Sequence, residues 1–264
     1  MASQLIAEKR FALSLAREAG QIIKENFASG LRFGMESKQK VDKTLVTKTD
    51  TDINDLVIKA VKKEFPDHDI LGEEKSDVKK KSKYTWVCDP LDGTSIFTYG
   101  IPLSVFSLAL VRDGVPVTGV VNHPYMNQIF SAEIHGGAYL NGNPISVSKS
   151  TTLERSAVGM AYWRSAQIDI DPLYHKLYKA GANILQLGSI AYMGALVSNA
   201  SIVASIHPAD MPYDSAALKV IIEEANGKVT DLYGNEQSYD GAIKGCIMSN
   251  GSLIHDELVR LFRE

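Results

Sequence analysis

Cysteine is scarce in this sequence, with only Cys88 and Cys246 among 264 residues. Two cysteines this far apart are too few to form a metal cluster or the disulfide framework of a secreted protein. We therefore expect both to be buried thiols.

Long apolar segments are also missing from residues 1–27, where Glu8, Glu18 and Glu25 interrupt the apolar positions. A signal peptide or a membrane span needs an uninterrupted apolar segment, so we expect a cytoplasmic protein with no membrane partner. The net charge of -3 and the isoelectric point near 6.1 give no global electrostatic reason to bind a nucleic acid polymer. Any anion that the protein binds must be held by local groups.

No internal repeat, low-complexity tract or linker separates the chain into parts. With 45% hydrophobic and 22% charged residues, 264 residues are enough for a substantial core. We expect one unit over residues 1–264, with soft halves at 1–150 and 151–264.

Apolar residues at three- and four-residue intervals predict a core-facing helix over residues 12–27. A second helix is predicted to begin with Asp50 or Thr51 as its N-cap and to end before Pro66. The polar residues 29–43 between these helices would form a loop or a hairpin flap.

From Tyr84 onward, short segments rich in Val, Ile and aromatic residues predict strands. Asn141-Gly142 predicts a tight hairpin, because both residues tolerate a positive φ. Helices are predicted again around residues 174–180, 189–198 and 215–225, with short strands between them. This mixed order predicts an α/β (α+β) layered sandwich of alternating helix and sheet layers.

The stretch WVCDPLDGTS, residues 86–95, carries the strongest chemical signal. Asp89 and Asp92 are three residues apart, so a bend at Pro90 and Gly93 is needed to point both at one centre. That bend exposes the Leu91 carbonyl, a hard oxygen donor suited to Mg²⁺. The N–H groups that follow, those of Gly93, Thr94 and Ser95, would open a short helix and hold a phosphate. A plain strand ending in a turn is the alternative reading.

Two further acidic clusters favour a metal site. Glu73 and Glu74 follow an apolar pair in ILGEEKS, as acids at a strand end do, and Asp214 opens a predicted helix in MPYDSAALKV. Taken singly, Glu73 could be a solvated loop acid and Asp214 a simple N-cap.

Together, these motifs resemble the inositol monophosphatase family, Mg²⁺-dependent and lithium-sensitive phosphomonoesterases. The resemblance runs nearly end to end and rests on an ordered set of motifs: LVTKTD, GEE, DPLDGT, GGAYLNGNPISVS, YDSAA and EEANGKVTD. It implies the family's layered fold, a homodimer and a small phosphorylated metabolite as substrate.

The resemblance also implies roles for individual residues. The metal ligands would be Glu73, Asp89, the Leu91 carbonyl, Asp92 and Asp214, which would hold two or three Mg²⁺ ions. Asp50 and Glu74 match acids that the family associates with the water and with a weaker metal. Phosphate would be held by Gly93, Thr94 and Ser95, and the alcohol side by Asp92, Ser189 and Ala191. His207, which departs from the family pattern, is a further candidate for substrate binding.

The implied mechanism is direct attack by a metal-activated water, with no phosphorylated residue. Thr94 and Glu73 would orient that water and accept its proton. Several acids around a bare phosphate would repel it, so the metal must be present before substrate binds. Lithium is the implied inhibitor.

The prediction of the substrate depends on His207. His207 occupies a position where inositol-specific relatives have an acid that binds sugar hydroxyls, which weakens the case for strict inositol specificity. His207 could contact a second anionic group, although a simple loop histidine is the favoured interpretation. An inositol monophosphatase-type activity is expected first. The alternatives are phosphatases for nucleotides or NADP, fructose 1,6-bisphosphate or histidinol phosphate on the same fold, or a non-catalytic binding protein, which the intact acids argue against.

Overall fold

The structure is a computed structural model that describes residues 2–28, 38–39, 45–78, 82–163 and 166–264. The helices are α1 (Ala2–Ala28), α3 (Lys48–Glu64), α4 (Thr94–Thr98), α5 (Asp171–Lys179), α6 (Ile190–Ser198), α7 (Ala216–Glu224) and α8 (Leu253–Arg263). Of two 3-10 turns, η1 (Pro124–Met126) joins two strands and η2 (Pro212–Asp214) joins a strand to α7.

Two sheets organise the described chain. The first has seven strands in the order β3 (Asp69–Gly72), β4 (Tyr84–Asp92), β5 (Val105–Arg112), β6 (Val115–His123), β7 (Gln128–Glu133), β8 (Ala138–Leu140) and β9 (Asn143–Pro144). The second has five, in the order β11 (Asn183–Leu185), β10 (Ala157–Met160), β12 (Ala204–His207), β14 (Cys246–Ser249) and β13 (Lys228–Thr230). A separate pair, β1 (Lys38–Gln39) and β2 (Leu45–Val46), is antiparallel.

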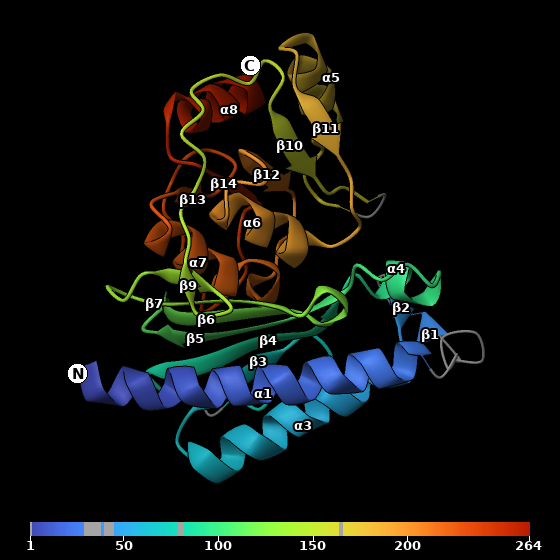
Figure 1. The fold of residues 1–264 in the computed structure, drawn as a ribbon, viewed down its shortest axis with the longest axis vertical. Coiled ribbons are helices and arrows are strands. Elements are labelled where there is room, and N and C mark those ends of the chain that lie inside the picture. Colours follow the sequence, from blue (N-terminus) through green and yellow to red (C-terminus); the bar gives the residue numbers. More distant parts are fainter. Residues whose placement is uncertain (1, 29–37, 40–44, 79–81, 164–165) are drawn as a thin grey trace.

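The elements stack in alternating layers (Figure 1). Helices α1 and α3 cover one face of the seven-stranded sheet, α6 and α7 lie between the two sheets, and α5 and α8 cover the far face of the five-stranded sheet. The expected layered sandwich of helices and sheets is therefore confirmed.

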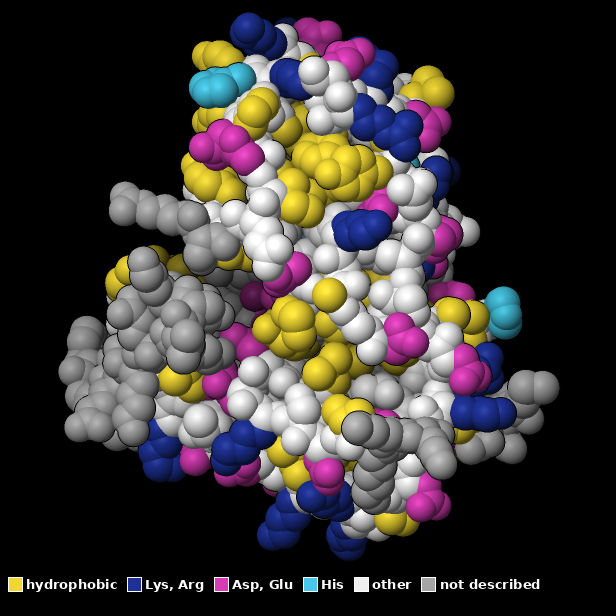
Figure 2. Space-filling model, turned by 180° about the vertical axis from the view of Figure 1, so that it is seen from behind, with side chains coloured by type: hydrophobic (Ala, Val, Ile, Leu, Met, Phe, Trp, Pro, Cys, Tyr) yellow, Lys and Arg dark blue, Asp and Glu magenta, His cyan; other side chains and the backbone are white. Residues whose placement is uncertain are grey.

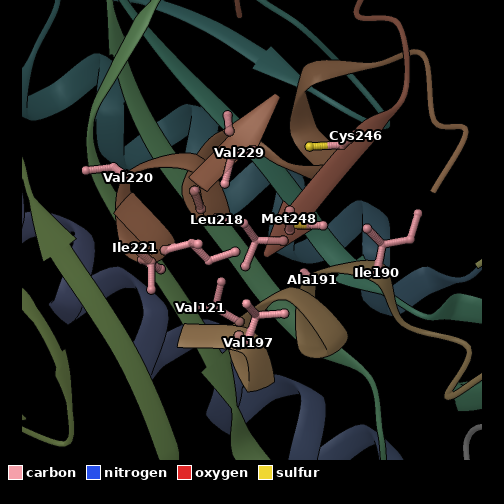
Figure 3. Packing of buried hydrophobic residues seen from close by; sticks show 14 of the residues in the cluster. Val121, Ile190, Ala191, Val197, Leu218, Val220, Ile221, Val229, Cys246 and Met248 are labelled. Carbon is pink, nitrogen blue, oxygen red and sulfur yellow. The ribbon is translucent and has the colours of Figure 1, made fainter. Parts of the chain in front are cut away.

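The largest buried cluster lies between the sheets and draws on both halves of the chain. Val121 of β6, Val197 of α6, Leu218 of α7 and Met248 of β14 surround one interior (Figure 3). Helix α7 is almost wholly buried there because both of its sides face a sheet. Both cysteines are buried thiols, as expected.

Local predictions from the first half hold with one correction. Helix α1 buries its apolar face, and Asn141 and Gly142 have φ of 51° and 82° in the turn between β8 and β9. Helix α3 ends before Pro66 but begins at Lys48 after Thr47, so Asp50 and Thr51 are not its N-cap. Most of the loop or flap expected over residues 29–43 lies outside the described residues.

In the second half, the predicted helices are found as α5, α6 and α7. Asp214 is not the first residue of α7, because α7 begins after Ser215. Asp214 is instead the last residue of the 3-10 turn η2. None of the helices in the described ranges combines the length and apolarity that crossing a membrane requires. On the face shown in Figure 2, Lys and Arg are interspersed with Asp and Glu.

Candidate active site

Strand β4 ends in the bend that the sequence predicts. Its pairing with β5 runs regularly to Asp89 opposite Ser107 and is then shifted before Asp92 meets Val105. The Leu91 N–H donates to Asp89 Oδ1 at 2.9 Å, which fixes the Asp89 carboxylate within the bend. Asp89 and Asp92 are both buried.

Glu73 is brought beside Asp89 by parallel pairing of β3 and β4. Gly72 lies opposite Cys88, and the Glu73 N–H donates to the Cys88 carbonyl at 3.1 Å. Glu73 is therefore an acid at a strand end, as predicted. Glu74 follows it in the turn after β3, and its role stays a prediction.

The Asp50 side chain extends from the first turn of α3 to Thr94, which follows the end of β4. One of its carboxylate oxygens accepts from the Thr47 hydroxyl and from the Thr47 N–H, the latter at 2.8 Å. The other oxygen accepts from Thr94 Oγ1 at 2.9 Å. Sequence reasoning missed Thr47, although the capping-box spacing of Thr47 and Asp50 in TKTD was a usable signal.

Asp92 joins the first half of the chain to the second. Its carboxylate accepts from the Ser189 hydroxyl and from the backbone N–H groups of Ala191 at 2.6 Å and Ile190 at 3.3 Å. These donors lie at the N-terminus of α6, where a carboxylate is stabilised by unpaired N–H groups and by the helix dipole. Ser189 and Ala191 thus contact Asp92, and their role as substrate-binding residues stays a prediction.

Gly93 follows Asp92 and is the N-cap of α4, with a φ of 91°. A Cβ at this position would lie 3.2 Å from the Gly188 carbonyl and 2.9 Å from Ile96 Cδ1. Glycine is thus required both by the backbone conformation and by the close approach to the turn before α6. Thr94 and Ser95 begin α4, and the N–H groups in a first helical turn have no carbonyl partner within the helix.

The acids of this site interact electrostatically; Asp50, Asp89 and Asp92 are buried, and Glu73 and Asp214 are partly buried. Burial, followed by the charges of Glu73, Asp92, Asp214 and Asp50, raises the pKa of Asp89 well above its ordinary value. These five acids therefore share one electrostatic centre. Like charges in a buried place are unfavourable unless a cation offsets them.

The pKa values of Asp92 and Asp50 are also raised. Burial raises the pKa of Asp92 to about 6 against the opposing effect of its hydrogen bonds from Ser189, Ala191 and Ile190. Burial likewise raises the pKa of Asp50 to about 6, although Thr47 and Thr94 donate to it.

The donor set fits a hard divalent cation. Every candidate ligand is an oxygen, from the four acids Glu73, Asp89, Asp92 and Asp214 and from the Leu91 carbonyl, as Mg²⁺ prefers. Within the described ranges, no group of three or more Asp, Glu, His or Cys side chains is already arranged so that it could hold a metal ion. The Asp92 carboxylate, for example, is engaged by α6 here.

His207 does not lie in a loop, so that interpretation is wrong. It is the last residue of β12, opposite Cys246, and its side chain has no exposed surface. Its Nδ1 accepts from the Ala209 N–H at 3.4 Å, and burial lowers its pKa to about 3. A neutral, enclosed imidazole is not placed to touch a substrate in this structure, contrary to its proposed binding role.

Tyr213 and Asp210 also lie at the acid centre. The pKa of Tyr213 is raised by burial and by the charges of Asp214, Glu73, Asp89 and Asp210. Asp210 was missed as a site residue because a lone acid in a Pro-rich segment is typical of a turn.

Comparison with known proteins identifies the family of the chain. A model of the inositol monophosphatase family matches residues 7–264. The chain is 33% identical over 255 residues to a fructose-1,6-bisphosphatase/inositol-1-monophosphatase of Thermotoga maritima, covering 96% of this chain and 95% of that protein. It is 29% identical over 246 residues to a histidinol-phosphatase of Chlorobaculum parvum, covering 92% of each. A solved structure of Thermotoga maritima IMPase matches with a TM-score of 0.85 and 30% identity over 96% of each chain.

These matches define the chain as a phosphatase, a hydrolase of phosphoric monoesters that acts on small phosphorylated substrates. Within this class, it belongs to the inositol monophosphatase family. The resemblance inferred from the motifs is confirmed.

Proposed function

We propose that this protein is a Mg²⁺-dependent phosphomonoesterase that transfers the phosphoryl group of a small metabolite directly to water. The observation that supports this proposal best is the shared electrostatic centre of Asp89, Glu73, Asp92, Asp214 and Asp50. A bound cation would offset the cost of burying these charges together.

Glu73, Asp89, the Leu91 carbonyl, Asp92 and Asp214 would hold the two or three Mg²⁺ ions that the family resemblance implies. Bound there, Mg²⁺ would supply Lewis acidity toward the phosphate and lower the pKa of water. Because the ligands come from both halves of the chain, we propose that residues 1–264 work as one catalytic unit.

The residues of the chain would position the reacting groups. The Thr94 hydroxyl donates to Asp50, so its oxygen can accept a hydrogen bond from the attacking water. As Thr94 takes up the proton of that water, its own proton would pass to Asp50. Glu73 would act with Thr94 as the proton acceptor. The N–H groups of Gly93, Thr94 and Ser95 would bind phosphate oxygens and stabilise charge as it develops.

Inositol 1-phosphate is the reference substrate, because relatives named for inositol monophosphatase activity match most of the chain. A histidinol-phosphatase-type activity is the second candidate, favoured by the match to the Chlorobaculum parvum protein. Inhibition by lithium, a homodimer and a cytoplasmic location are further proposals that rest on the family resemblance.

The test is phosphate release at neutral pH from inositol 1-phosphate, fructose 1,6-bisphosphate, histidinol phosphate, adenosine 3′,5′-bisphosphate and NADP, with and without Mg²⁺. The Asp92→Asn variant should lose activity. Asp113→Asn is the matched control, since Asp113 is exposed in the turn at the opposite end of β5, with a positive φ that Asn tolerates. A folded protein that releases no phosphate from any of these substrates would overturn the proposal.

A further inference from the structure

Two large aromatic side chains are exposed directly after β10. Tyr162 is 41% exposed and Trp163 is 37% exposed, so part of each aromatic ring is open to a ligand. The role proposed above for the acid centre does not use either ring.

Tyr162 and Trp163 follow the end of β10, and this strand end lies beside the end of β12, from which the chain continues to the active site. Strands β10 and β12 are parallel, and the Ala161 N–H donates to the Ile206 carbonyl at 3.1 Å. The chain after β10 and the chain after β12 therefore emerge side by side. The second of these chains runs through η2 to Asp214, and η2 packs against β4, which carries Asp89 and Asp92.

A side-chain hydrogen bond joins these two segments. Gln167 Nε2 donates to Asp210 Oδ2 at 2.9 Å. Asp210 is also held through its backbone, because its carbonyl accepts from the Ile243 N–H at 2.8 Å. Its charge is one of those that act on Tyr213, together with Asp214, Glu73 and Asp89. Gln167, which follows Tyr162 and Trp163 in the sequence, is thus held to the segment that leads to Asp214.

His207 stands where an acid that binds sugar hydroxyls would be expected, and it is enclosed, while Tyr162 and Trp163 are exposed on the neighbouring segment after β10. The Asp210 carboxylate already accepts from Gln167. Polyols need several hydrogen-bonding partners, whereas a flat heterocycle needs an aromatic face against which to stack.

We propose that Tyr162 and Trp163 are specificity-determining residues that stack against a flat aromatic heterocycle on the alcohol side of the phosphate ester. This inference rests on the proposed phosphatase function and ranks substrates with an aromatic heterocycle ahead of inositol 1-phosphate. The heterocycle could be an imidazole or a nucleobase, since both present the same aromatic face. The hydrogen bond from Gln167 to Asp210 positions the pair.

The first test compares kcat/KM for histidinol phosphate and adenosine monophosphate with that for inositol 1-phosphate. The ratio of either aromatic substrate to inositol 1-phosphate should exceed one in the unmodified protein and fall about tenfold in Trp163→Ala or Tyr162→Ala, as loss of ring stacking predicts. Trp163→Phe and Tyr162→Phe should recover most of the ratio. The better of the two aromatic substrates distinguishes an imidazole from a purine.

Tyr178→Ala is the matched control, because Tyr178 is an exposed ring on the outer helix α5. Its ratio should match that of the unmodified protein. An equal fall in kcat/KM for every substrate, or a preference for inositol 1-phosphate that the variants leave unaltered, would overturn the inference while leaving the phosphatase function intact. Absence of Mg²⁺-dependent release from all three would overturn both.

Fluorescence gives a test that does not depend on turnover. The chain has two tryptophans, and Trp86 is fully buried against His68, so a ligand that stacks in the site should change the emission of Trp163 alone. With Mg²⁺ and inorganic phosphate present, histidinol or adenosine should quench this emission, and myo-inositol should not. Quenching that persists in Trp163→Phe, or that myo-inositol causes equally, would contradict stacking on Trp163.

Discussion

Thr94 and Asp50 are separated by 44 residues in the sequence and joined by a hydrogen bond of 2.9 Å in the fold. The same Thr94 hydroxyl lies 3.1 Å from the Leu91 carbonyl, so its single proton is directed at two acceptors of the acid centre. The orientation of this hydroxyl therefore depends on α3, on the bend of β4 and on the start of α4 together.

Replacing Thr94 with Val should remove the hydroxyl that relays the proton of the water to Asp50, while conserving side-chain shape. We expect kcat to fall about 100-fold or more, a typical loss for a missing acid-base group, with a much smaller effect on KM. Steady-state kinetics at saturating Mg²⁺ give both constants. Thr94→Ser keeps the hydroxyl and should retain most activity; a Val variant as active as the Ser variant would rule out this role.

The Asp89→Asn substitution should distinguish the destabilisation that the Asp89 carboxylate causes without metal from its contribution to Mg²⁺ binding. Without metal, we expect the variant to melt at or above the temperature of the unmodified protein, because one of five mutually repelling charges is removed. Mg²⁺ at about 100 times its Kd should stabilise the unmodified protein by about 2.7 kcal/mol, or roughly 5–10 °C in a chain of this size. Calorimetry with and without Mg²⁺ measures both effects, and an equal Mg²⁺ shift in Asp89→Asn would contradict its role as a ligand.

Alanine at Gly93 should cost more than alanine at Gly142, although both have a positive φ. The backbone conformation alone costs about 1–2 kcal/mol in each. Gly142 has open space around its Cβ position, whereas Gly93 faces Ile96 and the Gly188 carbonyl. We therefore expect Gly93→Ala to lose further stability in urea and also most phosphatase activity. Equal unfolding free energies and full activity in both variants would show that the contact with Gly188 is unimportant.

His255 should make the fold sensitive to acid. It lies buried between Ser249 Oγ at 2.8 Å and Thr230 Oγ1 at 3.1 Å, and burial lowers its pKa to about 4. Because the unfolded chain takes up this proton first, the stability contributed by neutral His255 is present above about pH 6.5 and is lost as the pH falls toward 4.

The measurement is the unfolding free energy between pH 4 and pH 7.5 for the unmodified protein and His255→Gln. The unmodified protein should lose more stability on acidification, by up to about 3 kcal/mol. Parallel curves for the two proteins would show that His255 does not titrate in this way.

The acidic end of β4 was predictable because its signal is local. Two acids around Pro90, followed by Gly93, require a bend, and the bend is found where β4 and β5 change register. Glu73 was predictable for a similar reason, since an acid after a short apolar strand lies at the edge of a sheet.

The contacts of Asp92 and the place of His207 could not be derived in this way. Asp92 and Ser189 are 97 residues apart in the sequence, and the spacing of motifs does not predict a contact between residues so far apart. Strand β12 lies between β10 and β14 and is buried on both faces, so the alternating pattern that marks a half-exposed strand is missing. His207 next to a proline therefore looked like a loop residue.

The most direct test of the account is phosphate release from the best substrate in ¹⁸O-labelled water, with Mg²⁺ and after chelation. We predict Mg²⁺-dependent release with the label in the phosphate, and none above background from Asp89→Asn. Release that is unaffected by chelation, or label found in the alcohol, would contradict a metal-dependent attack of water on phosphorus.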